Sequence, residues 1–259
     1  MLDFEQVKAQ YPQPLQQYER GILREYLQYK ILQGIFESRY ASEVAFMGGT
    51  ALRIVYGNTR FSEDIDLDNL GLNWDQFDAL VETVNRFLLL EGFETELRKV
   101  EKVAYHCTIR FPAILYENGI SPLPDEKIRI QIDSFAQGYD YQPDLRILNK
   151  FDVFTEVRVT PLAVLLSQKI YAAANRKRPK GRDFYDITFL LSLTRPDFGY
   201  LTQKMGSGTP EQLREHFLEV TADNDFEALA RDVAPFLIRR EDEKRVLMFR
   251  AFWEQAALG

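Results

Sequence analysis

The sequence has few of the residues that build disulfides and zinc sites. It contains one cysteine, Cys107, and two histidines, His106 and His216. A single thiol cannot form an internal disulfide, which fits a reducing compartment. These three residues are also too few for a zinc centre of the usual Cys and His type. Because His106 and Cys107 are neighbours on an expected strand, their side chains face opposite ways, which argues against a His–Cys catalytic pair.

Long hydrophobic segments and a basic N-terminus are also missing. No stretch approaches the ~18 uncharged apolar residues of a membrane-spanning helix. The first five residues, Met-Leu-Asp-Phe-Glu, carry acids where a signal peptide carries bases. We therefore expect a cytoplasmic protein that has no membrane partner.

The chain lacks an excess of positive charge. Its 259 residues include 39 acidic and 32 basic side chains, which gives a net charge of −7. This balance excludes a uniformly basic nucleic-acid coat protein but not a local basic patch. Hydrophobic residues make up 46% and charged residues 27%, as in an average globular protein, so we expect one large or two smaller folded domains.

The hydrophobic pattern changes character near residue 159. Before that point, apolar runs and alternating segments predict strands between helices. The strands are expected at 44–47, 64–70, 93–100, 104–111, 127–133 and 151–159, and the helices at 14–38, 51–56 and 74–91. From Pro161 onward the pattern is helical, with Thr160 as an expected cap. Helices are expected there at 161–175, 183–193, 211–220, 225–236 and 241–257. We predict an α/β (α+β) domain with a mixed sheet and N-terminal helices over residues 1–159, and an all-helical domain over residues 160–259.

Two motifs close together in the first half indicate a site for a metal and a nucleotide. Gly48-Gly49 follows a buried strand, and two glycines allow a tight turn that another molecule can approach. The N–H groups of a following helix suit a phosphate, and Thr50 adds a hydroxyl or a cap. Asp64 and Asp66 alternate on a strand, so their carboxylates leave one face roughly 7 Å apart.

Each motif also has an ordinary structural explanation. A Gly-Gly pair is a common strand-to-helix turn, and Asp-x-Asp is a common solvated strand face. Two neighbouring carboxylates, however, raise each other's free energy unless solvent or a cation lies between them. Mg²⁺ binds carboxylates together with substrate phosphates. In the order strand, turn, helix, strand, the two motifs therefore predict a metal–nucleotide site.

Further charged residues lie in the second half. Lys169 stands on an otherwise apolar helix near three alanines that permit close approach, and Arg176 follows seven residues later on the same face. A snorkelling lysine is the alternative explanation. Asp183 and Asp186 are one helical turn apart, where an N-cap and a favourable helix-dipole charge would also explain them. The loop 176–182 holds five bases, which suit a triphosphate or an RNA backbone as well as they suit solvent.

The paired motifs resemble the signature of a known family. Gly-Gly-Thr-Ala-Leu-Arg at 48–53, followed by Arg-Phe-Ser-Glu-Asp-Ile-Asp-Leu at 60–67, is similar to the AbiEii/AbiGii toxin family of nucleotidyltransferases. These enzymes belong to the polymerase-β-like superfamily. The resemblance returns at 166–173 and 182–187. It implies a nucleotidyltransferase domain that binds an NTP and Mg²⁺, or Mn²⁺, between the α/β half and the helical half.

The resemblance also implies roles for individual residues. Asp64 and Asp66 would bind metal. A third carboxylate on a neighbouring strand would help to deprotonate the acceptor, and Asp133 is the candidate for it. An aspartate at a strand end that faces water is the alternative explanation for Asp133. Lys169 would hold triphosphate oxygens, and an acid near it would be Asp183 in preference to Asp186. The implied catalytic set is Asp64, Asp66, Asp133, Lys169 and Asp183, with Asp64, Asp66 and Asp133 as metal ligands. The implied nucleotide-binding set is Gly48, Gly49, Thr50, Arg53, Ser62, Lys169 and Arg176.

The family resemblance favours a toxin that attaches NMP to the 3′ end of tRNA and is restrained by a cognate antitoxin, in abortive infection or phage defence. Two other functions stay open. A nucleotidyltransferase for a small molecule such as an aminoglycoside would need an acceptor pocket rich in acids, for which Glu63, Asp68 and Asp75 are near enough in sequence. A catalytically silent module would use the fold only to dock a partner. The sequence contains neither a P-loop nor a Gly-x-Ser-x-Gly elbow.

Overall fold

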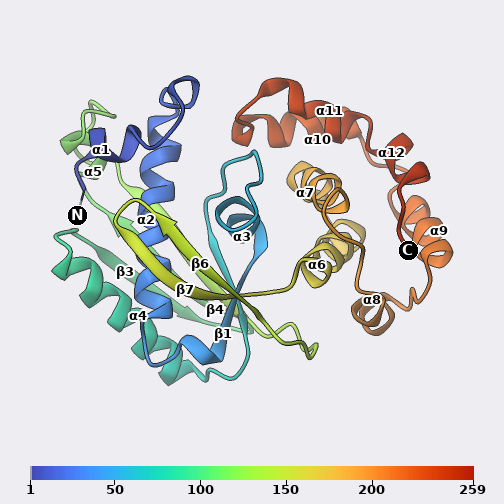
Figure 1. Ribbon diagram of the computed structural model, residues 1–259, viewed down its shortest axis with the longest axis horizontal. Helices are drawn as coiled ribbons and strands as arrows, with labels where there is room; N and C mark the ends of the chain where they lie inside the picture. The colour runs from blue at the N-terminus through green and yellow to red at the C-terminus, as the bar shows by residue number, and fades with distance from the viewer. Residues whose placement is uncertain (1) are drawn as a thin grey trace. The chain divides into compact units, whose positions relative to one another are not determined.

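The computed structural model describes residues 2–259, which divide into two compact units (Figure 1). Unit 1 comprises Met1–Tyr56 and Phe61–Val159, and unit 2 comprises Gly57–Arg60 and Thr160–Gly259. The short segment Gly57–Arg60 therefore leaves unit 1, packs with unit 2 and returns. Throughout residues 2–259, no helix combines the length and the apolar character needed to cross a membrane.

Unit 1 is built on one seven-stranded sheet with the order β3-β4-β5-β2-β1-β7-β6. Its strands are β1 Val44–Met47, β2 Ile65–Asn69, β3 Glu96–Glu101, β4 Tyr105–Phe111, β5 Ile128–Phe135, β6 Asp144–Lys150 and β7 Val153–Val159. The pairs β2–β5 and β1–β7 are parallel and the other pairs are antiparallel, so the predicted mixed sheet is confirmed. The expected segment 151–159 is the second strand of a hairpin whose first strand, β6, the pattern did not predict.

The helices of unit 1 are α1 Phe4–Lys8, α2 Glu19–Phe36, α3 Gly48–Ile54, α4 Trp74–Leu90 and α5 Ile114–Glu117, with 3₁₀ turns at Gln13–Leu15 and Ala41–Glu43. Helices α2 and α4 of unit 1 pack against this sheet. The isoleucines of β5 are buried and alternate with more exposed polar residues, which leaves the opposite face of the strand polar. The helix expected at 14–38 starts only at Glu19, because Tyr18 has a non-helical ψ of 47°.

The second half of the chain is helical within unit 2. Its helices are α6 Leu162–Asn175, α7 Gly181–Leu191, α8 Phe198–Met205, α9 Pro210–Val220, α10 Phe226–Val233, α11 Lys244–Leu247 and α12 Phe249–Gln255, with 3₁₀ turns at Ala234–Phe236 and Arg240–Glu243. Aromatic rings pack in its core: Phe184 and Phe249 have centroids 4.9 Å apart, and Phe217 and Trp253 are 4.4 Å apart. The single helix expected at 241–257 is broken into three short elements.

Two expected helix caps are wrong. Pro161 occupies the N-cap of α6 without a side-chain hydrogen bond, so Thr160 is not the cap. Helix α7 begins earlier than expected, with Lys180 as its N-cap, and Asp183 therefore lies inside the first turn. Since a side chain inside the turn is free to point away from the helix end, Asp183 is available for contacts other than capping.

A buried ion cluster joins three elements of unit 1. Glu25 of α2 is nearly inaccessible and accepts hydrogen bonds from Arg53 Nε at 2.7 Å, Lys150 Nζ at 2.8 Å and the Tyr11 hydroxyl at 2.7 Å. Burial alone would favour the neutral acid, but the charges of Arg53 and Lys150 hold the pKa of Glu25 below its ordinary value. The cluster thereby fixes α3 and the end of β6 against α2.

Replacing Glu25 with Gln should lower the free energy of unfolding at pH 7 by about 3–5 kcal/mol, because two cations lose their buried counter-charge. Since folding lowers this pKa, the difference from the wild type should be complete above the unfolded-state pKa of about 4.3 and should shrink as the pH falls through the lower pKa of the folded state. Urea titrations at a series of pH values measure both effects. Glu156→Gln, at an exposed position of β7, is the matched control and should change little.

Candidate active site

The turn after β1 brings Gly48 directly against Asp66. Gly48 opens α3 with φ +78°, a conformation that favours glycine, and a Cβ at this position would overlap Asp66 Oδ2. The first helical residue is therefore Gly48 itself and not Ala51, as the pattern predicted. Both the backbone conformation and the close approach of the carboxylate require glycine here.

Another aspartate, Asp133, lies beside Asp66. The parallel register of β2 and β5 places Asp133 next to Asp66, on strands about 4.8 Å apart. Asp133 Oδ1 lies 2.7 Å from His106 Nδ1, and Gln131 Nε2 donates to both of its oxygens at 2.8 and 3.0 Å. Because β5 continues to Phe135, Asp133 is not a strand-end residue that simply faces water.

Sequence reasoning missed the two residues that hold Asp133. His106 was considered only together with Cys107, yet the antiparallel register of β4 and β5 sets it opposite Asp133. Gln131 lies two positions before Asp133 on the same face of β5. That alternation was visible in the sequence, whereas the pairing with His106 depends on knowing which strands are neighbours.

The backbone of the Asp64–Asp66 strand is fixed from two sides. The buried Thr50 hydroxyl donates to the Asp64 carbonyl oxygen, and Gln28 Nε2 of α2 donates to the carbonyl oxygens of Ser62 and Glu63 at 3.0 and 3.1 Å. The Thr50 hydroxyl thus supports the protein backbone, and its expected role toward a nucleotide stays a prediction. Ser62 contributes its main chain to the same support.

Arg53 also differs from its expected role. Its Nε bonds the buried Glu25, and its guanidinium carbon lies 5.2 Å from the centroid of the Phe61 ring. This places Arg53 in the ion cluster that fixes α3 to α2. We therefore do not assign it to a nucleotide.

The donor set fits a hard divalent cation. Asp66 lies in β2 and Asp64 directly precedes the first residue of that strand, Ile65. Mg²⁺ commonly takes one or two carboxylates and completes its shell with water and substrate phosphates. Within residues 2–259, no group of three or more His, Cys, Asp or Glu side chains is arranged to hold a metal ion. The residues present therefore suit an ion that binds together with a phosphate substrate.

Unit 2 contains a second charged cluster, around Asp183 and Asp186 of α7. Both carboxylates are fully buried. Lys169 Nζ lies 2.9 Å from Asp186 Oδ2 and 3.4 Å from Asp183 Oδ1, and Arg176 Nε lies 3.0 Å from Asp183 Oδ2. Helix α6 ends at Asn175, so Arg176 does not continue the helical face of Lys169, but the two cations share one aspartate.

Arg60, the first residue of the motif at 60–67, also belongs to this cluster. It is buried and donates from Nε and Nη2 to the two oxygens of Asp186 at 2.7 and 2.6 Å, while Asn58 Nδ2 donates to Oδ1 at 2.9 Å. These bonds anchor the segment Gly57–Arg60, which directly precedes the Asp64–Asp66 strand in the chain. Both aspartates of α7 thus have partners: Asp186 anchors this segment and Asp183 pairs with two cations.

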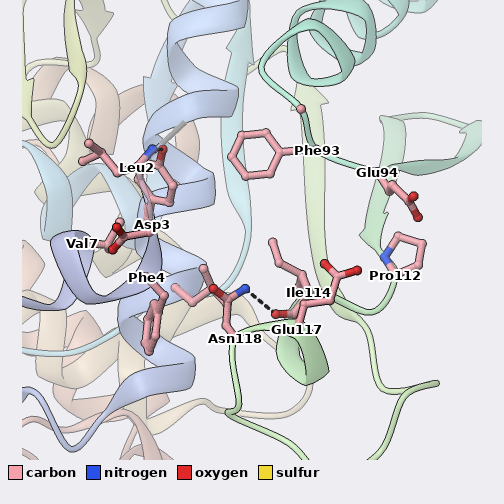
Figure 2. A pocket seen from close by; sticks show the side chains of 13 residues that line it. Leu2, Asp3, Phe4, Val7, Phe93, Glu94, Pro112, Ile114, Glu117 and Asn118 are labelled. Atoms are coloured by element: carbon pink, nitrogen blue, oxygen red, sulfur yellow. Dashed lines mark hydrogen bonds between the residues drawn. The ribbon is translucent and has the colours of Figure 1, made fainter.

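A separate cavity of about 360 Å³ lies elsewhere in unit 1 (Figure 2). Its walls include Phe4, Phe93 and Ile114, and Asn118 Nδ2 donates to the Ile114 carbonyl oxygen at 2.7 Å beside it. None of the residues predicted to act in catalysis lines it. The cavity is therefore not part of the candidate active site.

Replacing Asp186 with Asn should lower the free energy of unfolding at pH 7 by about 3–5 kcal/mol, because Arg60 would stay buried without its counter-charge. Burial favours the neutral acid, but Arg60 and Lys169 hold the pKa of Asp186 at about 2. The difference from the wild type should therefore be complete above the unfolded-state pKa of about 3.9 and decrease as the pH falls towards 2. Chemical denaturation tests this, with exposed Asp223→Asn as the control; equal stabilities would contradict it.

Known families and solved structures include proteins similar to this chain. The family model for nucleotidyl transferase AbiEii toxins of type IV toxin–antitoxin systems matches residues 30–253. JHP933 from Helicobacter pylori is similar in structure, with a TM-score of 0.58, 15% identity, and coverage of 92% of this chain and 91% of that one. A candidate nucleotidyltransferase from H. pylori gives a TM-score of 0.55, 16% identity, and coverage of 92% and 94%. No curated protein matches the chain.

At these identities the structural likeness establishes the fold alone, whereas the family match covers most of the chain. The matched range contains the Gly48 turn, the three aspartates of unit 1 and the charged cluster of unit 2. The protein therefore belongs to the AbiEii family of nucleotidyl transfer toxins of type IV toxin–antitoxin systems, and it is a nucleotidyltransferase.

Proposed function

We propose that this toxin transfers NMP from an NTP to the 3′ end of tRNA in a Mg²⁺-dependent reaction in the cytoplasm. Unit 1 would be the polymerase-β-like catalytic domain, and the helices after residue 159 would form a second domain. The family implies a cognate antitoxin, which would restrain the reaction. The observation that carries the proposal is the contact of Asp66 with Gly48 on one side and its register with Asp133 on the other.

The aspartates of unit 1 would have different roles in the reaction. Asp64 and Asp66 would hold the metal ion, which would supply neutralisation of the charge that develops on the transferred phosphoryl group. Asp133 would accept the proton of the attacking hydroxyl group. His106 and Gln131 orient its carboxylate, so the accepting oxygen is held in place before the acceptor arrives.

The cations of unit 2 are proposed to bind the triphosphate. Lys169 and Arg176 both pair with Asp183, which keeps their charged groups oriented. Neither is completely buried: Lys169 retains 13% and Arg176 43% side-chain exposure. A phosphate can therefore reach them while their aspartate partner stays fixed.

The structure does not favour the small-molecule acceptor. Asp68 is buried and accepts hydrogen bonds from the Gln137 backbone N–H at 2.9 Å and the Tyr141 hydroxyl at 2.8 Å. Glu63 pairs with Arg24 at 2.6 Å, and Asp75 lies in the exposed first turn of α4. The three acids that such a pocket needed therefore serve other parts of unit 1.

A labelling assay tests the proposal directly. Purified protein incubated with each α-³²P-NTP, Mg²⁺ and total tRNA should transfer label to RNA from a preferred NTP. Asp66→Ala should reduce transfer by about 10²–10³-fold, since several kcal/mol of transition-state stabilisation is lost. Asp140→Ala, at an exposed position, is the control. Transfer to a protein or small molecule but not to RNA would contradict the proposed RNA acceptor. Unchanged transfer by Asp66→Ala would contradict the assignment of the active site.

Gly48→Ala should abolish most transfer without unfolding the protein. The new methyl group would displace the Asp66 carboxylate, and a shift of about 1 Å in a catalytic group commonly lowers the rate about 10²-fold. Gly119→Ala is the matched control, because Gly119 has φ +69° and open space where the methyl group would lie. Both variants therefore carry backbone strain, and only Gly48→Ala should lose activity. Equal rates for the two would show that the contact with Asp66 is not needed.

A further inference from the structure

A polar hollow of about 500 Å³ adjoins the candidate active site within unit 1. Asp64 lines it, together with four bases: Arg24 of α2, Arg110 of β4, and Lys127 and Arg129 at the start of β5. Its other acids are Glu63 and Asp125. No role in ligand binding has been assigned to these bases above, and Arg110 and Arg129 lie on the face of the sheet that also carries Asp133.

Two of the bases are paired with acids and two are not. Arg24 bonds Glu63 at 2.6 Å, and Lys127 bonds Glu96 at 2.7 Å. Within residues 2–259, Arg110 and Arg129 form no ion pair or side-chain hydrogen bond. The hollow therefore presents two guanidinium groups whose donors are available to a ligand.

The two arginines stand directly opposite each other. The antiparallel register of β4 and β5 pairs Arg110 with Arg129, four positions along each strand from the pair His106 and Asp133. Like charges directly opposite each other destabilise a sheet. An anion between them would remove this repulsion, and guanidinium groups bind phosphate oxygens in a bidentate manner.

The position of the hollow identifies which phosphate it suits. In the sheet order, β5 and β4 lie on one side of β2, and β1 with the Gly48 turn lies on the other. In-line transfer places the attacking and leaving oxygens on opposite sides of the phosphorus. Because Asp133 is proposed to receive the proton of the attacking hydroxyl, Arg110 and Arg129 lie on the acceptor's side.

The distance fits a short single strand. Asp133 lies four positions after Arg129 on β5, which is about 13 Å at 3.3 Å per residue. A stacked strand rises about 3.4 Å per nucleotide, so the arginines would meet a phosphate about four nucleotides from the 3′ hydroxyl. We propose that this hollow, which we call the arginine hollow, binds backbone phosphates of a single-stranded RNA 3′ end. The inference rests on the proposed function, which supplies the attacking hydroxyl.

The test compares Arg110→Gln/Arg129→Gln with Arg86→Gln/Arg240→Gln, two exposed arginines without ion pairs outside the hollow. The substrates are an RNA hairpin with a four-nucleotide single-stranded 3′ extension and the same hairpin with a blunt end. For the extended RNA, the hollow variant should raise the dissociation constant about 10–100-fold, as expected for two lost contacts to charged groups. The slope of log affinity against log salt should fall by about 1.4. The KM for NTP should stay within twofold, and blunt RNA should show no added loss.

Several results would overturn the assignment. Equal affinity of the hollow and control variants for extended RNA would show that the hollow does not bind the acceptor. An increase in the KM for NTP without a change in RNA binding would assign the arginines to the nucleotide triphosphate instead. Arg110→Lys/Arg129→Lys keeps the charge and should recover part of the affinity, so no recovery, with unfolding measured alongside, would indicate a structural defect.

The binding and transfer measurements also distinguish this inference from the proposed function. RNA binding is measured without NTP. If the wild type binds RNA through the two arginines but transfers no label to RNA, the assignment of the hollow is supported and the proposed reaction is wrong. If transfer to RNA does not depend on the two arginines, the proposed reaction is supported and the assignment of the hollow is wrong.

Discussion

The contact between the Asp66 carboxylate and the Gly48 backbone is the constraint on which the candidate site depends. It exists only because β1 and β2 pair in antiparallel register, with Met47 opposite Asp66, so that the residue after Met47 turns over the carboxylate. A side chain at Gly48 would occupy the same space. The turn, the strand pairing and the position of Asp66 are therefore one geometric condition, and the parallel register of β2 with β5 extends it to Asp133.

Buried charge elsewhere in each unit keeps the surrounding elements in place. In unit 1, Glu25 joins α2 to Arg53 of α3, the helix that begins at Gly48. In unit 2, Asp186 holds Arg60 and Asn58, which precede the Asp64–Asp66 strand in the chain. Buried ion pairs contribute little net stability compared with apolar packing. Breaking one, however, leaves an uncompensated charge buried in the protein. Their value here lies in fixing one arrangement of the segments that carry the proposed chemistry.

The sequence predicted what local pattern determines and missed what long-range pairing determines. Alternation gave β2 and β5 with nearly correct ends, and it placed Asp64 and Asp66 on one face. The proximity of Asp133 to Asp66 was expected from the family, but its bonds to His106 depend on the pairing of β4 with β5, which the pattern does not encode. Arg60 and Asp186 are 126 residues apart in the chain, and no periodicity connects them. Thr50 and Arg53 were expected to bind a nucleotide from the motif at 48–53. Their partners within the protein, the Asp64 carbonyl oxygen and Glu25, lie outside that segment, so the motif did not indicate them.

The charge balance of the molecule explains why an acceptor site would be small. A protein of net charge −7 repels a polyanion at a distance, and salt screens that repulsion beyond about 8–10 Å. Binding must then come from cations at contact distance. In the arginine hollow, Arg24 and Lys127 already have acidic partners, so only Arg110 and Arg129 are left for phosphate. Two contacts are enough to place a strand end and too few to retain a long duplex by charge alone, which would suit release of each RNA after the proposed modification of its terminus.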